Sequence, residues 1–491
     1  MTLGHPTDNA LYYGDCLDWM RQWPNGIVDL IYLDPPFNSQ QNYNMLFSPE
    51  GGGDAQYRAF ADTWVWDTAA AERLDRYLSA IALPSHNAIS GLYRMLGESG
   101  MLAYLTYMAE RLEECHRLLK PTGSIYLHCN QTASHYLKAL MDSIFGHRNF
   151  VNEIVWNYGT PSGGRAGGQK PVKVHDTLLV YAKDYGKHLY HRQFTPYSEK
   201  YIHDWFRHQD DDGRFYRTRS RKGKIVRQYL DKSPGVPLST VWSDIMQLYG
   251  QRGWFPTKKS ESLGYPTQKP LALLDRIIKA SSSPGDLVLD PFCGCGTTVA
   301  SANALDRRWI GIDIDSHAIE VMLERLDNRN IPTNGIPFDY RSAARLARDK
   351  PFGFETWAIQ RTPGFAPNVR QVGDGGIDGR ATLTIRPDNW ESRLAIAQVK
   401  GGKSPPVDGL RAFCRVTERQ QAAVGCYITL DPIQSPQARA ESYLGNIHVS
   451  GVQYDRMNLW SIHDYFEERY PRLPPMNNPY TGKPLAQGAL F

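Results

Sequence analysis

The sequence predicts an α/β protein with a doubly wound sheet and a second, smaller α/β domain. Short apolar runs alternate with amphipathic helical patterns through about the first 330 residues, and this alternation is typical of a sheet covered by helices on both faces. Two of the runs end in sharp turns, one rich in proline and one rich in glycine. About 160 residues follow position 330, enough for another hydrophobic core.

Length and composition set wide limits. The chain has 491 residues, 41% of them hydrophobic, so two to four domains of ordinary globular composition are expected. It has no run of 18 apolar residues, and Met1–Ala10 is polar, so we expect neither a membrane segment nor a signal peptide. Seven scattered cysteines without a CxxC pair favour a reducing cytoplasm. A net charge of +4 does not demand a nucleic-acid partner, but it permits a local basic patch.

The elements of the first domain are expected in a regular order. The first half should hold strand 11–15, helix 17–23, strand 28–33, helix 105–120, strand 124–128, helix 134–144, strand 150–158 and strand 175–183. The later part should hold helix 271–281, strand 287–290, a helix from 297, strand 309–314 and helix 316–329. Residues 38–66 are too many for a plain connection and rich in aromatics, which favours a functional loop.

The proline turn is the first candidate site. Asp34, Pro35, Pro36 and Phe37 follow the apolar run 28–33 directly. Proline fixes φ, so the stiff turn holds a carboxylate and a ring at the carboxyl edge of the sheet, where ligands bind in open α/β folds. Asp34 and the Pro35 carbonyl can accept the two N–H bonds of an exocyclic amine, while Phe37 can stack on a base taken out of a duplex. An ordinary surface aspartate after a proline-terminated strand is the alternative.

The glycine turn is the second candidate site, about 250 residues downstream. Strand 287–290 runs into Pro291-Phe292-Cys293-Gly294-Cys295-Gly296-Thr297, and a helix begins there. The glycines let the backbone approach a ligand, and the free N–H groups of a helix N-terminus attract an anionic group. Asp313 ends the next strand, about 20 residues later, where dinucleotide folds hold a ribose diol. A dinucleotide dehydrogenase would use the same geometry.

Together the two turns resemble those of the amino-methyltransferases that act on DNA at adenine N6 or cytosine N4. The catalytic turn precedes the glycine turn, which is similar to the circularly permuted β-class of that family, and the resemblance covers about residues 8–330. It implies a Rossmann-like sheet that binds S-adenosylmethionine (SAM) and a site-specific enzyme that methylates adenine N6. The form of the Asp34 turn favours adenine, and cytosine N4 is the alternative on the same scaffold.

The resemblance also implies a set of cofactor-binding residues. Asp15 would accept from the adenine amine of SAM, although a helix N-cap is the alternative for this residue. Lys269 would lie next to the SAM carboxylate, and Asp313 stands where the family more often has Glu. The full set is Asp15, Lys269, Asp290, Phe292, Gly294, Gly296, Thr297 and Asp313.

Residues 184–260 lose the alternating rhythm and hold a basic window. Basic side chains neutralise phosphates and aromatic rings stack on bases, so this window is expected to bind double-stranded DNA. In the amino-methyltransferases, this position holds the target-recognition region. A merely solvated basic face is the alternative. The candidate DNA-binding residues are Arg214, Arg217, Arg219, Arg221, Lys222, Lys224 and Arg227.

The last third of the chain carries a third pattern. Asp378, Gln398 and Lys400 resemble the core of PD-(D/E)xK nucleases, in the variant with glutamine found in Mrr-type restriction enzymes, and Glu355 adds a carboxylate from a helix. In that family the aspartate binds Mg²⁺ and the lysine positions the attacking water. A domain that only binds DNA is the alternative. We therefore expect a cytoplasmic enzyme of a restriction-modification or defence system, and a homodimer is one possible assembly.

These interpretations divide the chain into six parts. They are a catalytic half at 8–183, a target-recognition insert at 184–260, a SAM-binding half at 261–330, a linker at 331–350, a restriction-endonuclease-like domain at 351–470 and a loosely held tail at 471–491.

Overall fold

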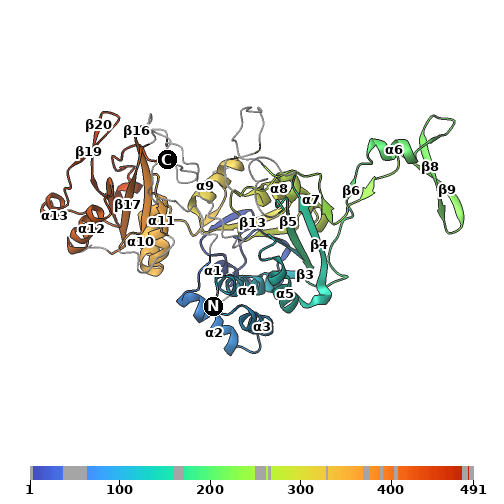
Figure 1. Cartoon of the computed structure of the whole chain (residues 1–491), viewed down its shortest axis with the longest axis horizontal. Helices are drawn as coiled ribbons and strands as arrows, with labels where there is room; N and C mark the ends of the chain where they lie inside the picture. The colour runs from blue at the N-terminus through green and yellow to red at the C-terminus, as the bar shows by residue number, and fades with distance from the viewer. Residues whose placement is uncertain are drawn as a thin grey trace.

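The structure is a computed structural model of the whole chain (Figure 1). It describes residues 4–36, 64–159, 171–248, 261, 263, 267–327, 330–368, 376–386, 391–402, 407–477 and 485. Phe37 and nearly all of the expected loop 38–66 therefore lie outside the described residues.

A large sheet brings together the two strands that carry the candidate turns. Its strand order is β11-β4-β5-β3-β2-β12-β13-β1-β14. Strand β2 (Val28–Leu33) pairs in parallel with β12 (Leu287–Asp290), although more than 250 residues separate them in the chain. Strand β13 (Arg308–Asp313) and then β1 (Ala10–Tyr13) extend the parallel part. Because parallel strands end at one edge, both candidate turns lie at the same edge of the sheet.

The other half of the sheet is mixed. Strand β3 (Leu119–Cys129) is parallel to β2, whereas β5 (His175–Ala182) is antiparallel to β3 and to β4 (Phe150–Asn157). The short strand β11 (Val241–Trp242) pairs with β4. The insert expected at 184–260 therefore ends earlier than predicted, because the chain rejoins the large sheet at β11.

Helices cover both faces of this sheet, as the sequence predicts. One face is covered by α1 (Cys16–Met20), α2 (Thr68–Ser79), α3 (His86–Leu96), α4 (Gly100–Leu118) and α5 (Ser134–Met141). The other is covered by α7 (Leu271–Ser281), α8 (Thr297–Ala304) and α9 (Ser316–Arg325). Strand β2 feeds both cores alternately: Leu30 and Tyr32 pack on the α7 side, and Ile31 and Leu33 on the α4 side. In the described part of the chain, no helix is both long and apolar enough to cross a membrane.

An arm made of residues 194–237 projects from the body (Figure 1). Its base is the pair β6 (Phe194–Thr195) and β10 (Val236–Pro237), and α6 (Glu199–Trp205) follows β6. Its end is an antiparallel sheet of β7 (His208–Gln209), β8 (Phe215–Arg221) and β9 (Lys224–Tyr229). Lys222 and Gly223 form the tight turn, both with positive φ, at 50° and 75°.

The C-terminal unit has its own five-stranded mixed sheet, in the order β15-β16-β17-β18-β21. The strands are β15 (Ala366–Pro367), β16 (Gly379–Arg386), β17 (Glu391–Lys400), β18 (Val424–Thr429) and β21 (Met457–Ser461). The remaining elements are α11 (Pro351–Gln360), α12 (Val407–Arg419), α13 (Pro436–Glu441), β19 (Asn446–Val449), β20 (Val452–Asp455) and α14 (Ile462–Phe466).

Two expectations about the ends of this unit are wrong. The expected linker 331–350 is folded: β14 (Thr333–Asn334) joins the large sheet beside β1, and α10 (Tyr340–Asp349) begins with a capping box at Asp339. The start of the expected loose tail is also fixed, because Met476 is 2% exposed and bridges to β16. Both segments gain partners that lie far away in the sequence, which local patterns cannot reveal.

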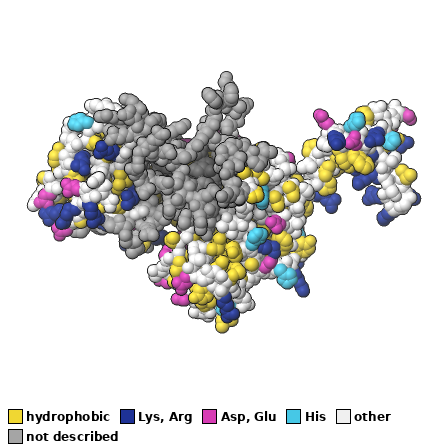
Figure 2. All heavy atoms as spheres, viewed as in Figure 1, with side chains coloured by type: hydrophobic (Ala, Val, Ile, Leu, Met, Phe, Trp, Pro, Cys, Tyr) yellow, Lys and Arg dark blue, Asp and Glu magenta, His cyan; other side chains and the backbone are white. Residues whose placement is uncertain are grey.

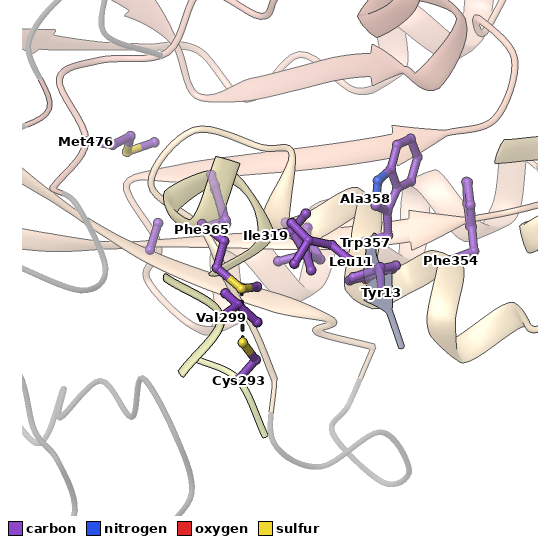
Figure 3. Packing of buried hydrophobic residues seen from close by; sticks show 14 of the residues in the cluster. Leu11, Tyr13, Cys293, Val299, Ile319, Phe354, Trp357, Ala358, Phe365 and Met476 are labelled. Atoms are coloured by element: carbon purple, nitrogen blue, oxygen red, sulfur yellow. Dashed lines mark hydrogen bonds between the residues drawn. The ribbon is translucent and has the colours of Figure 1, made fainter. Parts of the chain in front are cut away.

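One hydrophobic core runs from the large sheet into the C-terminal unit. Leu11 and Tyr13 of β1 and Ile319 of α9 belong to the same buried cluster as Trp357 and Ala358 of α11 (Figure 3). The two units are therefore packed together at the edge of the large sheet that carries Asp313.

Candidate active site

A cleft lies at the carboxyl ends of β2 and β12. Asp34 lines it from the proline turn, Phe292, Gly294 and Thr297 line it from the glycine turn, and Lys269 lines it from the segment before α7. The structure thus brings residues of both candidate turns to the lining of one cleft.

Asp34 and Lys269 both line this cleft, and they form an ion pair. Both side chains are mostly buried, with exposed fractions of 15% and 12%. Lys269 Nζ also lies 3.4 Å from the Thr267 carbonyl oxygen, to which it donates. The structure therefore places Lys269 on the Asp34 carboxylate, and contact with a cofactor carboxylate remains a prediction.

The glycine turn is held by two carboxyl groups, those of the buried Asp290 and the half-buried Asp313. Asp313 accepts hydrogen bonds from Gly294 N at 2.7 Å and from Asp315 N at 2.8 Å, and Asp290 accepts from Phe292 N at 3.0 Å. Burial raises the pKa of both Asp290 and Asp313 to about 7. Both acids shape the turn in addition to any contact with a ligand.

The turn itself requires glycine. Gly294 and Gly296 have φ values of +53° and +73°, in the left-handed region. A Cβ atom at Gly296 would also lie 2.5 Å from Cγ of Met322, which packs beneath the turn. The positive φ values let the chain reverse sharply before α8, so that the N-terminus of this helix opens into the cleft.

Asp15 is the N-cap of α1. Its Oδ1 accepts from Leu17 N at 2.9 Å, and Arg111 Nη2 donates to both carboxylate oxygens, at 2.8 Å to Oδ1 and 2.6 Å to Oδ2. Arg111 is only 2% exposed and lies 3.2 Å over the Tyr107 ring. The alternative interpretation of Asp15, a helix N-cap, is confirmed. Binding of a cofactor adenine by Asp15 stays a prediction.

The sequence interpretation missed Gln360, at the end of α11. Its Oε1 accepts from Ser316 N at 3.2 Å and from the Tyr13 hydroxyl at 3.3 Å, and its Nε2 donates to Asp315 Oδ1 at 3.2 Å. Since Asp315 N donates to Asp313, the C-terminal unit is connected to the glycine turn. No sequence signal identifies this glutamine, because its partners lie about 45 and 350 residues away.

The arm divides the candidate DNA-binding residues into two groups. Arg217 is 8% exposed, donates to Gln228 Oε1 at 3.0 Å and lies 5.1 Å from the Phe206 ring. Arg214 donates to Asp210 at 3.0 Å and lies over the Tyr229 ring. The expectation that Arg217 offers its guanidinium to DNA therefore does not fit the structure, because that group stabilises the arm.

The other basic residues are exposed towards the end of the arm, where dark blue side chains gather (Figure 2). Strand pairing places Arg221 opposite Lys224 and Arg219 opposite Val226 on one face of the ribbon, while Arg227 lies on the other face over the Tyr216 ring. Lys222 occupies the turn. The exposed group is Arg219, Arg221, Lys222, Lys224 and Arg227.

In the C-terminal unit, three of the four candidate nuclease residues share one sheet edge. Asp378 precedes β16, and its carboxylate accepts from Val399 N at 2.7 Å. Gln398, which is 8% exposed, and Lys400 project from the same face of β17, two residues apart. Glu355 lies on α11, half-buried, in a helix that packs against β17.

The sequence profile of the DNA methylase family N6_N4_Mtase matches residues 28–324. The chain belongs to this DNA methylase family. The matched range contains both turns and the arm, and it ends before the C-terminal unit.

Curated relatives are DNA methyltransferases. The chain is 28% identical over 326 residues to Type II methyltransferase M.BamHI of Bacillus amyloliquefaciens, covering 65% of the chain and 57% of the relative. It is 33% identical over 225 residues to M.HpaI of Haemophilus parainfluenzae, covering 46% and 60%. It is 26% identical over 321 residues to the DNA adenine methyltransferase YhdJ of Escherichia coli (strain K12), covering 65% and 82%. The chain thus spans less than two thirds of the first two relatives.

Solved structures give a weaker likeness. A complex of M1.HpyAVI with SAM is 18% identical, with a TM-score of 0.33, and covers 65% of this chain and 98% of that one. The cytosine-N4-specific PvuII DNA methyltransferase is 13% identical, with a TM-score of 0.36, and covers 66% and 88%.

Proposed function

We propose that this chain is a site-specific DNA methyltransferase that moves a methyl group from SAM to the N6 amine of adenine. The observation that carries the proposal is the shared cleft, which Asp34 and the glycine turn both line. Membership of the DNA methylase family supports it. The order of the two turns also supports assignment to the permuted β-class, since β2 and β12 are neighbours in the sheet despite their order in the chain.

The donor set of the cleft fits SAM. The glycine turn offers backbone N–H groups at the start of α8, Thr297 offers a hydroxyl and Phe292 offers a ring. Asp313 does not line the cleft but contacts Gly294 of the turn, and its carboxyl group would hold a ribose diol. SAM supplies an electrophilic methyl group when bound. Asp290 and Asp313 keep the turn in shape beneath it.

Asp34 orients the amine. The lone pair of an exocyclic amine is delocalised into the ring, so the amine is a weak nucleophile until its geometry changes. Asp34 and the Pro35 carbonyl accept the two N–H bonds and direct the lone pair towards the methyl group, with Phe37 expected to stack on the extruded base. Attack gives a cationic amine that loses its proton readily, so positioning supplies most of the acceleration.

The arm is suited to hold double-stranded DNA. A two-stranded antiparallel ribbon fits the major groove, where arginine can recognise guanine and lysine can neutralise phosphate. Arg219, Arg221 and Lys224 share one face of the β8–β9 ribbon and are exposed. Ile225, 79% exposed near the turn, adds an apolar contact on the other face.

The C-terminal unit is proposed as a nuclease-like domain. The meeting of Asp378, Gln398 and Lys400 at one sheet edge supports this. Asp378 would hold Mg²⁺ and Lys400 would position water, while Gln398 lacks the charge of the usual acid, which weakens metal affinity. Asp378→Ala, assayed for DNA cleavage with Mg²⁺ against the wild-type chain, tests the proposal. Mg²⁺-dependent cleavage that survives the substitution would come from elsewhere, and a wild type that binds DNA without cutting supports the binding-only alternative.

The test of the methyltransferase proposal is transfer of a radiolabelled methyl group from SAM to duplex DNA. Asp34→Asn should lower the rate by about 100-fold, because the amine loses its positioning carboxylate. Asp18→Asn is the matched control, since Asp18 is half-exposed on α1 and pairs with Lys350 at the surface. Nucleoside analysis of the product distinguishes adenine N6 from cytosine N4. An Asp34→Asn variant as active as the control would reject the assignment.

A further inference from the structure

A buried polar chain leads from the cleft into the sheet. Tyr32 of β2 lines the cleft, and its hydroxyl oxygen lies 2.9 Å from Nδ1 of His128 on β3. His128 Nε2 lies 3.5 Å from Asp176 Oδ2 on β5, and the other oxygen of Asp176 lies 2.5 Å from Lys173 Nζ. Tyr32 is 2% exposed and His128 is fully buried.

Strand register explains why these side chains meet. Tyr32 pairs with Tyr126, and His128 pairs with Leu178, so three neighbouring strands present polar groups near the same edge. Tyr32 and Asp34 are two residues apart, which places both on one face of the chain. They line the same cleft.

The imidazole of His128 is fixed in orientation. The Trp156 ring packs edge-on against it, with centroids 5.7 Å apart and planes at 88°. Trp156 is itself held by a 2.8 Å hydrogen bond from its Nε1 to the Ile245 carbonyl. A ring held on three sides has little freedom to exchange its two nitrogen positions.

The protonation pattern follows from Asp176. Burial acts to raise the pKa of Asp176, but the contact with His128 and the charge of Lys173 hold it well below its ordinary value. An ionised carboxylate only accepts, so the Nε2 that faces it carries the hydrogen. With that hydrogen on Nε2, Nδ1 is the acceptor in the 2.9 Å contact and takes the hydroxyl hydrogen of Tyr32. The lone pairs of the oxygen are then left as acceptors, on a residue that lines the cleft.

We propose that Tyr32 is a further residue of the methyl-transfer site, whose hydroxyl oxygen is held as an acceptor for the polarised C–H groups of the methyl group in transit. This inference rests on the proposed function. The oxygen forms no covalent bond: the methyl–sulfur bond breaks, the methyl–nitrogen bond forms, and the amine proton leaves as before. An oriented dipole in a dry cleft stabilises a developing positive charge without reorganisation during the reaction. His128 and Asp176 act through Tyr32 and are positioning residues.

The test uses single-turnover methyl transfer by the full chain. Tyr32→Phe should lower the rate about two- to fivefold, because one C–H···O acceptor is lost. The dissociation constants for SAM and DNA, and the melting temperature, should stay close to wild type. His128→Gln should also lower the rate, and the double variant should match Tyr32→Phe alone, because phenylalanine has no hydroxyl to orient.

The outcomes separate this inference from the proposed function. An active wild type with an equally active Tyr32→Phe variant would overturn the inference alone. If the rate losses of Tyr32→Phe and His128→Gln multiply in the double variant, His128 does not act through Tyr32, and its positioning role is overturned. A wild-type chain that transfers no methyl group would overturn the proposed function, and the inference with it. Asp176→Asn serves as a second positioning variant, expected to lower the rate with SAM affinity unchanged.

Discussion

Replacing Gln360 by leucine tests whether the C-terminal unit supports the cofactor site. Gln360 makes three hydrogen bonds to the ends of β1 and β13, and one of them goes to Asp315. Asp315 N donates to Asp313, and Asp313 accepts from Gly294 N. The substitution therefore removes the hydrogen bond to Asp315, which is linked to Gly294 of the glycine turn through Asp313.

The size of the effect follows from the bonds that are lost. A hydrogen bond to a charged carboxylate contributes about 1.5 kcal/mol, and the two neutral bonds contribute about 1 kcal/mol each. The neutral bonds mainly hold α11 against the large sheet, so their loss should lower stability. The bond to Asp315 reaches the turn itself, and its loss should weaken SAM binding about tenfold.

Isothermal titration of SAM into the full chain measures this effect. Glu320→Gln is the control, because it breaks the ion pair between α9 and Arg361 at the same interface without touching the Asp313–Asp315 turn. The control should lower the melting temperature and leave the SAM dissociation constant unchanged. Wild-type affinity in Gln360→Leu, or equal weakening in the control, would refute the reasoning.

Three further predictions concern stability and DNA binding. Asp15→Ala should lower the free energy of unfolding by about 3 kcal/mol, because Arg111 is left buried without its carboxylate. Urea denaturation measures this loss. A loss below about 1 kcal/mol would show that the Asp15–Arg111 pair contributes little to stability. Replacing Arg219, Arg221 and Lys224 together by alanine should weaken DNA binding. The slope of log affinity against log salt concentration should become less steep by the amount expected for about three phosphate contacts. An unchanged slope would show that the DNA binds elsewhere on the protein. Burial raises the pKa of Asp313 from 3.8 to about 7. Its contribution to the free energy of unfolding is therefore full below pH 3.8 and is lost as the pH rises from there through about 7. Asp313→Asn should therefore flatten the fall in unfolding free energy over this range, and an unaltered pH profile would contradict that assignment.

The sequence predicts the arrangement of the site because strand ends carry strong local signals. The proline turn after β2 and the glycine turn after β12 are both readable as the ends of apolar strands. Two such strands in one parallel sheet place their turns at one edge, whatever their order in the chain. These two signals were enough to predict the cleft that Asp34 and Gly294 line.

Partners that are distant in the sequence could not be predicted. Arg217 belongs to a basic window, yet it is buried against Tyr201, Phe206 and Gln228 once the arm folds. Arg111 gives no sign that it pairs with Asp15. Segment 331–350 carries the local signals of one short helix, a capping box at Asp339 and a buried face at Ala343 and Ala347, but they do not reveal the surface on which it packs. Segment 471–477 has no periodic pattern, so its pairing with β16 could not be predicted.

The most direct measurement is an experimental structure of the chain with a SAM analogue and a duplex containing its target site. We predict one base out of the stack, its exocyclic nitrogen within hydrogen-bond reach of the residue 34 carboxylate and in line with the donor sulfur bound above residues 294–296. A target base bound away from residue 34, or a donor bound away from the glycine loop, would contradict the account.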